Sequence, residues 1–145
     1  MSVLYADTSA LVRAYLADEP DHEVLRATIL EGDEPVTTSD ISRVEIARAL
    51  KAAERAGRLE DAGPVLERVD ADLSGMPILT IRLDPVALVP RSRELVIAHR
   101  LRTLDAFHLA VALSLDVWAD GEQVALVTRD SGQASAARAL GLAVL

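Results

Sequence analysis

Cysteine is absent from this chain of 145 residues, and aromatic side chains make up only 3% of it. The lack of cysteine excludes a disulfide scaffold, a thiolate zinc site, an iron–sulfur cluster and a catalytic cysteine. Hydrophobic residues nevertheless account for 50% of the chain. A chain of this length can bury a substantial core as one domain, and here that core must consist mainly of Ala, Val, Leu and Ile.

Positive charge is also scarce. The 15 Lys and Arg residues are outnumbered by 23 Asp and Glu residues, which gives a formal net charge of −8. Because proteins bind nucleic acids largely through Lys and Arg contacts with phosphates, this balance disfavours such a partner unless positive charge is supplied locally. The sequence has no basic leader before Asp7 and no apolar run of about 18 residues, so we expect a cytoplasmic protein without a membrane span.

Short β-like segments alternate with helical ones along the whole chain. This order predicts an α/β fold in a single domain of residues 1–145, with a central parallel sheet flanked by helices on both faces. The expected strands are 3–6, 36–38, one within 76–83, 124–128 and 142–145. The expected helices include 39–55, 103–115, 131–140, one after Pro64, and one or two between 86 and 99.

The expected helices carry particular caps and buried faces. Thr8 or Ser9 is expected to cap the first helix and Asp21 the second, because short polar side chains accept hydrogen bonds from free backbone N–H groups. The second helix is expected to turn Val24 inward. In helix 39–55 the apolar spacing predicts one buried face, made of Ile41, Val44, Ala47 and Leu50.

Four acidic residues follow strands or lie near the starts of helices at one edge of the predicted sheet. Asp7 and Asp130 come directly after strands. Glu45 lies in the helix after the second strand, and Asp105 lies in the first turn of an apolar helix. Ligand sites of open parallel sheets form at this carboxyl edge. We therefore expect the four side chains to share a pocket.

Each of these acids also has a purely structural interpretation. Asp7, Asp105 and Asp130 occupy positions at which a carboxylate stabilises a helix N-terminus. Ser42 and Glu45 match a capping box. Only the joint placement favours a site, in which carboxylates within about 4–6 Å raise one another's pKa values until cations bind. An oxygen-only donor set of this kind suits Mg²⁺ or Mn²⁺.

Motifs of several other enzyme classes are missing. The chain has no phosphate-binding P-loop, no G-x-G-x-x-G, no H-E-x-x-H and no G-x-S-x-G nucleophile elbow. His22, His99 and His108 do not form a ligand set. His108, three residues after Asp105, is expected to be a packed or hydrogen-bonded side chain.

Four short segments carry the acids in a characteristic order. DTSALV occupies residues 7–12, SRVEIARAL 42–50, LRTLDAFHLA 101–110 and LVTRD 126–130. The series resembles the PIN-domain family, and most closely its VapC-type toxins of bacterial toxin–antitoxin pairs. The resemblance covers nearly the whole chain. It implies a metal-dependent endoribonuclease that hydrolyses RNA phosphodiesters with metal-activated water and serves as the toxin of a type II pair.

The resemblance also implies residue roles. Mg²⁺ or Mn²⁺ would be the cofactor, and two polar side chains, Ser9 and Thr128, would support the acids. The catalytic and metal-binding acids would be Asp7, Glu45 and Asp105, with Asp130 as the fourth.

One departure from the family concerns the segment 115–124. This segment is longer and more acidic than the usual family connection. Asp116 and Asp120 are therefore rivals of Asp130 for the role of the fourth acid.

Partners follow from the same resemblance. Family members cut structured RNA, often transfer or ribosomal RNA, usually form homodimers, and are inhibited by an antitoxin whose tail enters the active-site groove. The acidic charge of this chain favours a basic antitoxin tail, because Arg side chains pair bidentately with carboxylates. Two alternatives remain open, a catalytically inactive PIN-fold interaction protein and a DNA-directed metal nuclease. The arginines near the acids in sequence, none of them assigned to RNA, are Arg43, Arg48, Arg100, Arg102 and Arg129.

Overall fold

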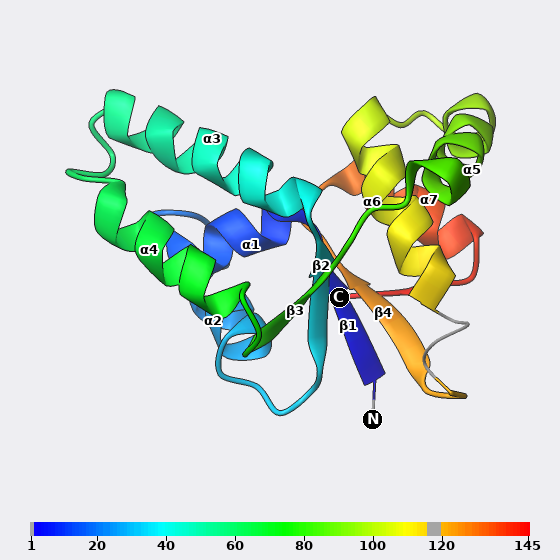
Figure 1. The fold of residues 1–145 in the computed structure, drawn as a ribbon, viewed down its shortest axis with the longest axis horizontal. Helices are drawn as coiled ribbons and strands as arrows, with labels where there is room; N and C mark the ends of the chain where they lie inside the picture. Colours follow the sequence, from blue (N-terminus) through cyan, green and yellow to red (C-terminus); the bar gives the residue numbers. More distant parts are fainter. Residues whose placement is uncertain (1, 116–119) are drawn as a thin grey trace.

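A five-stranded parallel sheet forms the centre of the computed structural model, which describes residues 2–115 and 120–145 (Figure 1). The strand order is β3-β2-β1-β4-β5. The predicted strands are confirmed, with ends that differ by one or two residues. They are β1 (Ser2–Ala6), β2 (Val36–Ser39), β3 (Ile78–Ile81), β4 (Gln123–Val127) and β5 (Ala143–Val144).

Helices cover both faces of this sheet, as predicted (Figure 1). One layer consists of α1 (Thr8–Tyr15), α2 (His22–Ile29), α3 (Ile41–Arg55) and α4 (Gly63–Asp72). The other consists of α5 (Pro85–Ala98), which continues as one helix through Pro90, α6 (Thr103–Ser114) and α7 (Ser131–Ala139).

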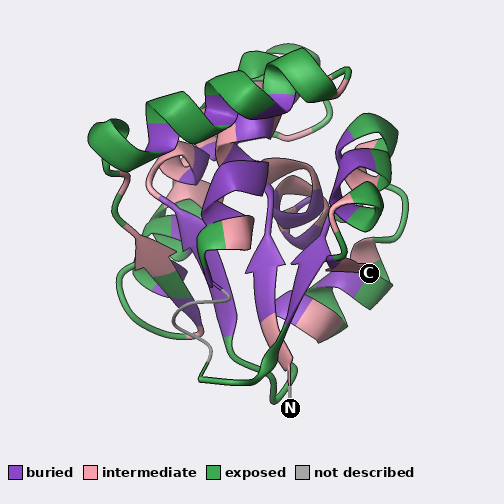
Figure 2. Cartoon of the chain, turned by 90° about the vertical axis from the view of Figure 1, so that its right-hand side faces the viewer, coloured by how far each residue is buried: buried purple, intermediate pink, exposed green. Residues whose placement is uncertain are grey.

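Successive strand residues feed two separate cores, because side chains of a strand alternate between the faces of a sheet. Leu4 and Ala6 pack with α1–α4, whereas Tyr5 packs with α5–α7. Figure 2 shows the buried strands between helices whose outer faces are exposed. Among the described residues, no helix is both long and apolar enough to cross a bilayer.

The first helix has a different cap from the predicted one. Asp7, rather than Thr8 or Ser9, is the N-cap of α1, and its Oδ1 accepts a hydrogen bond of 3.0 Å from the backbone N–H of Ala10. Asp7 therefore does stabilise a helix N-terminus, as its structural interpretation predicted. It places the carboxylate directly at the carboxyl end of β1.

The second helix begins after Asp21, as predicted, but the roles predicted for the Asp21 and Val24 side chains are wrong. Asp21 precedes α2 with a φ of 62° and makes no side-chain capping bond. Instead, its Oδ2 accepts a hydrogen bond of 2.7 Å from Nε of Arg129. Val24 is 61% exposed.

The buried face of α3 is also rotated from the predicted one. Val44 is 71% exposed, and Ser42 takes a buried position because its hydroxyl pairs at 2.7 Å with that of Thr38 on β2. The predicted capping box is therefore absent, and Glu45 is available to the pocket. The buried residues of α3 are Ser42, Ile46, Leu50 and Ala53.

Candidate active site

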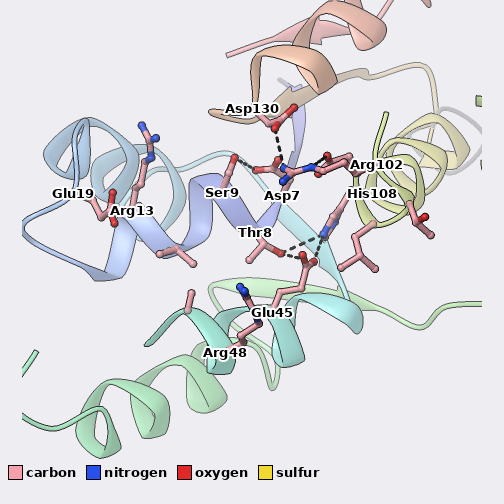
Figure 3. Close-up of a pocket in the computed structure, with 15 residues that line it drawn as sticks. Asp7, Thr8, Ser9, Arg13, Glu19, Glu45, Arg48, Arg102, His108 and Asp130 are labelled. Carbon is pink, nitrogen blue, oxygen red and sulfur yellow. Dashed lines mark hydrogen bonds and ion pairs between the residues drawn. The ribbon is translucent and has the colours of Figure 1, made fainter. Parts of the chain in front are cut away.

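A cavity of about 570 Å³ opens at the carboxyl edge of the sheet, where the two helical layers meet (Figure 3). The structure brings all four predicted acids to its wall: Asp7, Glu45, Asp105 and Asp130. They come from four distant segments, the end of β1, the second turn of α3, the first turn of α6 and the N-cap of α7. The parallel topology explains this convergence, because it carries the ends of β1, β2 and β4 to the same edge.

Asp7 forms the buried floor of the pocket, with only 2% of the residue exposed. Its Oδ1 accepts hydrogen bonds from the Ser9 hydroxyl at 2.7 Å and the Ala10 N–H at 3.0 Å, and its Oδ2 accepts one from the Thr128 hydroxyl at 2.6 Å. Burial raises the pKa of the Asp7 carboxyl, although these hydrogen bonds oppose the shift. The carboxylate is thus fixed in orientation but poorly solvated.

Ser9 and Thr128, the predicted supporting residues, both contact this floor. The Ser9 hydroxyl also accepts a hydrogen bond of 2.8 Å from the Arg129 N–H, which ties α1 to the segment after β4. The Thr128 hydroxyl accepts a hydrogen bond of 3.0 Å from the Asp130 N–H. The two hydroxyls therefore fix the position of Asp7 relative to the start of α7.

Glu45 occupies one wall of the pocket and is held through a single oxygen. Its Oε1 accepts hydrogen bonds from Nε2 of His108 at 2.6 Å and from the Thr8 hydroxyl at 2.8 Å (Figure 3). Burial alone would raise the pKa of Glu45, but the hydrogen bond to His108 and the electrostatic interaction with it, aided by the Thr8 hydroxyl, outweigh burial and lower the pKa.

His108 is buried and hydrogen-bonded, as predicted, but its place on the pocket wall was not foreseen. Because an ionised carboxylate only accepts, Nε2 donates to Glu45. Nδ1 lies 2.8 Å from the hydroxyl of Tyr5. Burial, reinforced by the charges of Asp7 and Glu45, raises the pKa of Tyr5 far above its ordinary value, so the phenol stays protonated. The three-residue spacing from Asp105 was the available signal, since it puts both side chains on one face of α6.

The outer side of the pocket, which we call the rim, consists of Asp105, Asp130 and Arg102. The Asp105 side chain is 16% exposed, that of Asp130 25% and that of Arg102 80%. Nε of Arg102 donates to Oδ2 of Asp105 at 3.0 Å, and Nη2 donates to Oδ2 of Asp130 at 3.2 Å. Oδ1 of Asp130 accepts from the backbone N–H of Gln133 at 2.8 Å, so this acid is also the N-cap of α7.

At Asp7 and Glu45, the pKa shifts do not come from the mutual repulsion of acids that was expected. The pKa of Asp7 is raised by burial, whereas that of Glu45 is lowered through its hydrogen-bonding partners. In the described part of the chain, no three His, Asp or Glu side chains are grouped closely enough to hold a metal ion. Two of the pocket acids, Asp105 and Asp130, are instead joined by the guanidinium of Arg102.

The donor chemistry nevertheless fits a hard divalent cation. The hydrogen bonds between described residues use Oε1 of Glu45 and Oδ2 of Asp105, and the second oxygen of each of these pocket-lining carboxylates accepts none from them. Oxygen ligands are those that Mg²⁺ and Mn²⁺ prefer.

Three residues were candidates for the fourth acid, and only Asp130 lies at the pocket among those that the structure describes. Asp116 lies outside the described residues. Asp120 is exposed in the turn that precedes β4, so it lies at the amino end of the strands, opposite the edge that holds the pocket. Asp130 follows β4 at the carboxyl end and lines the pocket.

The arginines near the acids divide into structural and pocket-lining ones. Arg43 donates to the carbonyl of Leu73 at 2.8 Å, and Arg129 pairs with Asp21, so both tie elements together. Arg100 does not line the pocket. The arginines that do are Arg48, Arg102 and Arg13, the last of which was not predicted from the sequence.

This fold and this acid-lined edge are those of a PIN domain. A family model for the PIN domain matches residues 4–139, and the chain belongs to that family. Within it the chain is related to VapC proteins. It is 35% identical to a protein of Mycobacterium tuberculosis named ribonuclease VapC46, over 152 residues that cover 100% of this chain and 98% of the relative.

Two solved structures share the fold at low sequence identity. One is M. tuberculosis VapC20, titled a sarcin-ricin loop cleaving toxin, with a TM-score of 0.64, 18% identity, and coverage of 92% of this chain and 94% of the other. The second is a toxin–antitoxin complex from Klebsiella pneumoniae, with a TM-score of 0.59, 18% identity, and coverage of 90% and 88%.

Proposed function

We propose that this protein is a metal-dependent endoribonuclease and the toxin of a type II toxin–antitoxin pair. The observation that carries the proposal is the convergence of four carboxylates from separate segments on one cavity. Membership of the PIN family and the 35% identical relative named a ribonuclease support RNA as the substrate.

The residues that would hold Mg²⁺ or Mn²⁺ are Asp7, Glu45, Asp105 and Asp130. Such an ion supplies an activated water as nucleophile and stabilises the charge that develops on the scissile phosphate. Of the four acids, Asp7 is the most rigidly placed, because three donors fix both of its oxygens. Asp7 would therefore fix the position of the bound ion, and the other three acids would complete its coordination.

His108 and Thr8 orient the second acid. Both donate to Oε1 of Glu45, which leaves Oε2 as the oxygen that would bind the ion. The Tyr5 hydroxyl in turn fixes the imidazole ring from its other side. This chain of hydrogen bonds favours the ionised form of Glu45 and fixes the orientation of its carboxylate. His108 acts here as a positioning residue.

The RNA backbone would lie against the side of the pocket that α1 and α3 form, where two arginines line the cavity. Arg13 on α1 and Arg48 on α3 line the cavity, and neither forms an ion pair with another described residue. Guanidinium groups bind phosphate through paired hydrogen bonds. They would supply locally the positive charge that the acidic chain lacks overall.

The proposed protein partner is a cognate antitoxin with a basic tail that enters the acid-lined pocket, and the proposed assembly is a homodimer. The antitoxin is supported by the similar fold of the K. pneumoniae toxin–antitoxin complex and by the net charge of −8. The cytoplasm, which contains transfer and ribosomal RNA, would be the site of action.

The test is a cleavage assay with antitoxin-free protein on total cellular RNA, in Mn²⁺ or Mg²⁺ and in EDTA. Discrete metal-dependent fragments that are absent with Asp105→Asn are the expected result. Cleavage of DNA with no cleavage of RNA would identify a DNA-directed nuclease. Equal silence of the wild type and the variant would contradict the proposal and favour an inactive interaction protein.

A further inference from the structure

Arg102 stands out among the pocket-lining residues because it pairs with two of the acids at once. It precedes α6 with extended backbone angles, and its side chain crosses from Asp105 on its own helix to Asp130 at the start of α7. Of the described arginines and lysine, it is the one that forms an ion pair with any of the four pocket acids, and it pairs with two of them. Within the pocket, the guanidinium therefore occupies a position between acids that a metal ion would also favour.

Arg102 binds carboxylate oxygens that a metal ion held by Asp105 and Asp130 would also use. Both ion pairs use an Oδ2 atom, and the other oxygen of Asp130 already caps α7. A divalent ion that bridges the two acids would need at least one of the oxygens that Arg102 now occupies. The guanidinium and the ion are both cations, so they repel each other when they approach the same oxygen, and each weakens the binding of the other.

Arg102 can also give up its two ion pairs at a small cost in free energy. Its side chain is 80% exposed, whereas the acids that it joins are 16% and 25% exposed. A long exposed side chain loses little when its ion pairs are exchanged for water, since such pairs are weak and screened by salt. Arg102 is thus a cation held at the rim by two weak contacts rather than a structural tie.

We propose that Arg102 is a counter-cation built into the pocket, which pairs with one oxygen each of Asp105 and Asp130 and competes with the divalent ion for these two acids. This inference rests on the metal site of the proposed function and goes beyond it, because it assigns a role to a residue that is not a ligand. The arginine keeps the rim acids compensated in the ion-free protein and sets how much free metal is needed to load the site.

The test is Mn²⁺ binding by isothermal titration calorimetry with wild type, Arg102→Gln and a matched control, Arg100→Gln. Arg100 is exposed, lies two residues away and does not line the pocket, so the control makes the same change in net charge. The expected result is that Arg102→Gln lowers the Mn²⁺ dissociation constant by about three- to tenfold, the scale of two exposed ion pairs. The control stays within about twofold of wild type, the change expected when a charge outside the pocket is removed and largely screened.

A second measurement separates competition from a merely structural role. In EDTA, Arg102→Gln is expected to melt at a lower temperature than wild type, since the two acids then repel without compensation. Saturating Mn²⁺ is expected to remove most of that difference, because the ion replaces the guanidinium. A structural tie would leave the variant equally destabilised in both conditions.

The outcomes distinguish this inference from the proposed function. If wild type binds Mn²⁺ and cleaves RNA but Arg102→Gln binds no more tightly, the inference is wrong and the nuclease stands. If only Arg102→Gln binds measurably, the inference is supported in its strongest form. If neither protein binds Mn²⁺, the inference and the metal site are both overturned.

Discussion

The floor and the rim of the pocket hold their carboxylates in opposite ways. At the floor, Asp7 is buried and fixed by hydroxyl and backbone donors of neutral groups. At the rim, Asp105 and Asp130 are partly exposed and held by the exposed charge of Arg102. The floor therefore holds its carboxylate through neutral donors, whereas the rim adds a positive charge, and only Asp130 there has a backbone donor as well.

This difference indicates how an acidic pocket stays folded without its cation. A buried carboxylate satisfied only by neutral donors retains a desolvation cost, which the raised pKa of Asp7 reports. The cost falls on one residue, while the remaining acids are compensated by Arg102 or, for Glu45, by His108. The free energy that a divalent ion would recover is therefore concentrated at the floor.

The largest effect that we expect comes from removing the charge of the floor. Asp7→Asn should reduce metal-dependent RNA cleavage by about 100-fold or more, the scale on which loss of one electrostatic group acts in an active site. Asp130→Asn should cost less, because Asp130 lies at the exposed rim and has a separate capping role. Initial cleavage rates at saturating Mn²⁺ measure both.

The folded state supplies the control for that comparison. The amide that replaces the carboxylate in Asp7→Asn can keep its oxygen toward Ser9 and the Ala10 N–H, so this variant should melt no lower than wild type in EDTA. Equal losses of activity in the two variants would contradict the division into floor and rim.

The second prediction concerns the donors that fix the floor. Thr128→Val removes the 2.6 Å hydrogen bond to Asp7 and leaves that buried oxygen without its donor. Loss of a partner to a charged buried group costs about 2 kcal/mol, and urea unfolding in EDTA should show it. Thr128→Ser keeps the hydroxyl and should lose less than half as much. A loss in Thr128→Ser as large as that in Thr128→Val would contradict the prediction, because the serine keeps the hydroxyl.

The third prediction uses the opposite pKa shifts of Asp7 and Glu45. Because the folded pKa of Asp7 is raised, its contribution to stability is present at low pH and is lost as pH rises through that folded pKa. Glu45 has a lowered pKa, so its contribution is present above the unfolded pKa and is lost as pH falls through the folded one. The two carboxyls therefore give the unfolding free energy opposite dependences on pH.

Unfolding free energies in EDTA, measured from about pH 3 to about pH 8, test this contrast. The wild type minus Asp7→Asn difference should decline as pH rises, and the wild type minus Glu45→Gln difference should increase. If both differences in unfolding free energy change with pH in the same direction, the pKa values of Asp7 and Glu45 are not shifted in opposite directions.

The sequence predicted the fold and the convergence of the acids because both depend on pattern. Alternating strands and helices lead to a parallel sheet, and residues that follow parallel strands must meet at one edge. This logic brought Asp7 and Asp130 together although they lie far apart in the chain. It also explains why strand positions were predicted to within one or two residues.

What the sequence did not predict depends on pairs of side chains that only the folded chain brings together. Val44 was expected to be buried because it is apolar, yet Ser42 takes the inward position through its bond to Thr38. Likewise, no spacing rule connects Tyr5, His108 and Glu45, which lie in three elements. The pKa of Glu45 is lowered by that contact, so mutual repulsion of acids was the wrong basis for it.

The smallest expected effects belong to the arginines on the open side of the pocket. Arg48→Ala should weaken RNA binding by a few-fold and reduce the salt dependence of binding by about one phosphate contact, while the rate at saturating RNA stays close to that of wild type. Arg55→Ala, on the exposed face of the same helix and away from the cavity, is the matched control and should change neither quantity. Filter binding of RNA to the Asp105→Asn protein, across a range of salt concentrations, measures affinity without cleavage. If Arg48→Ala leaves the salt dependence unchanged, the RNA backbone does not cross α3, and the open side of the pocket must face another surface of the substrate.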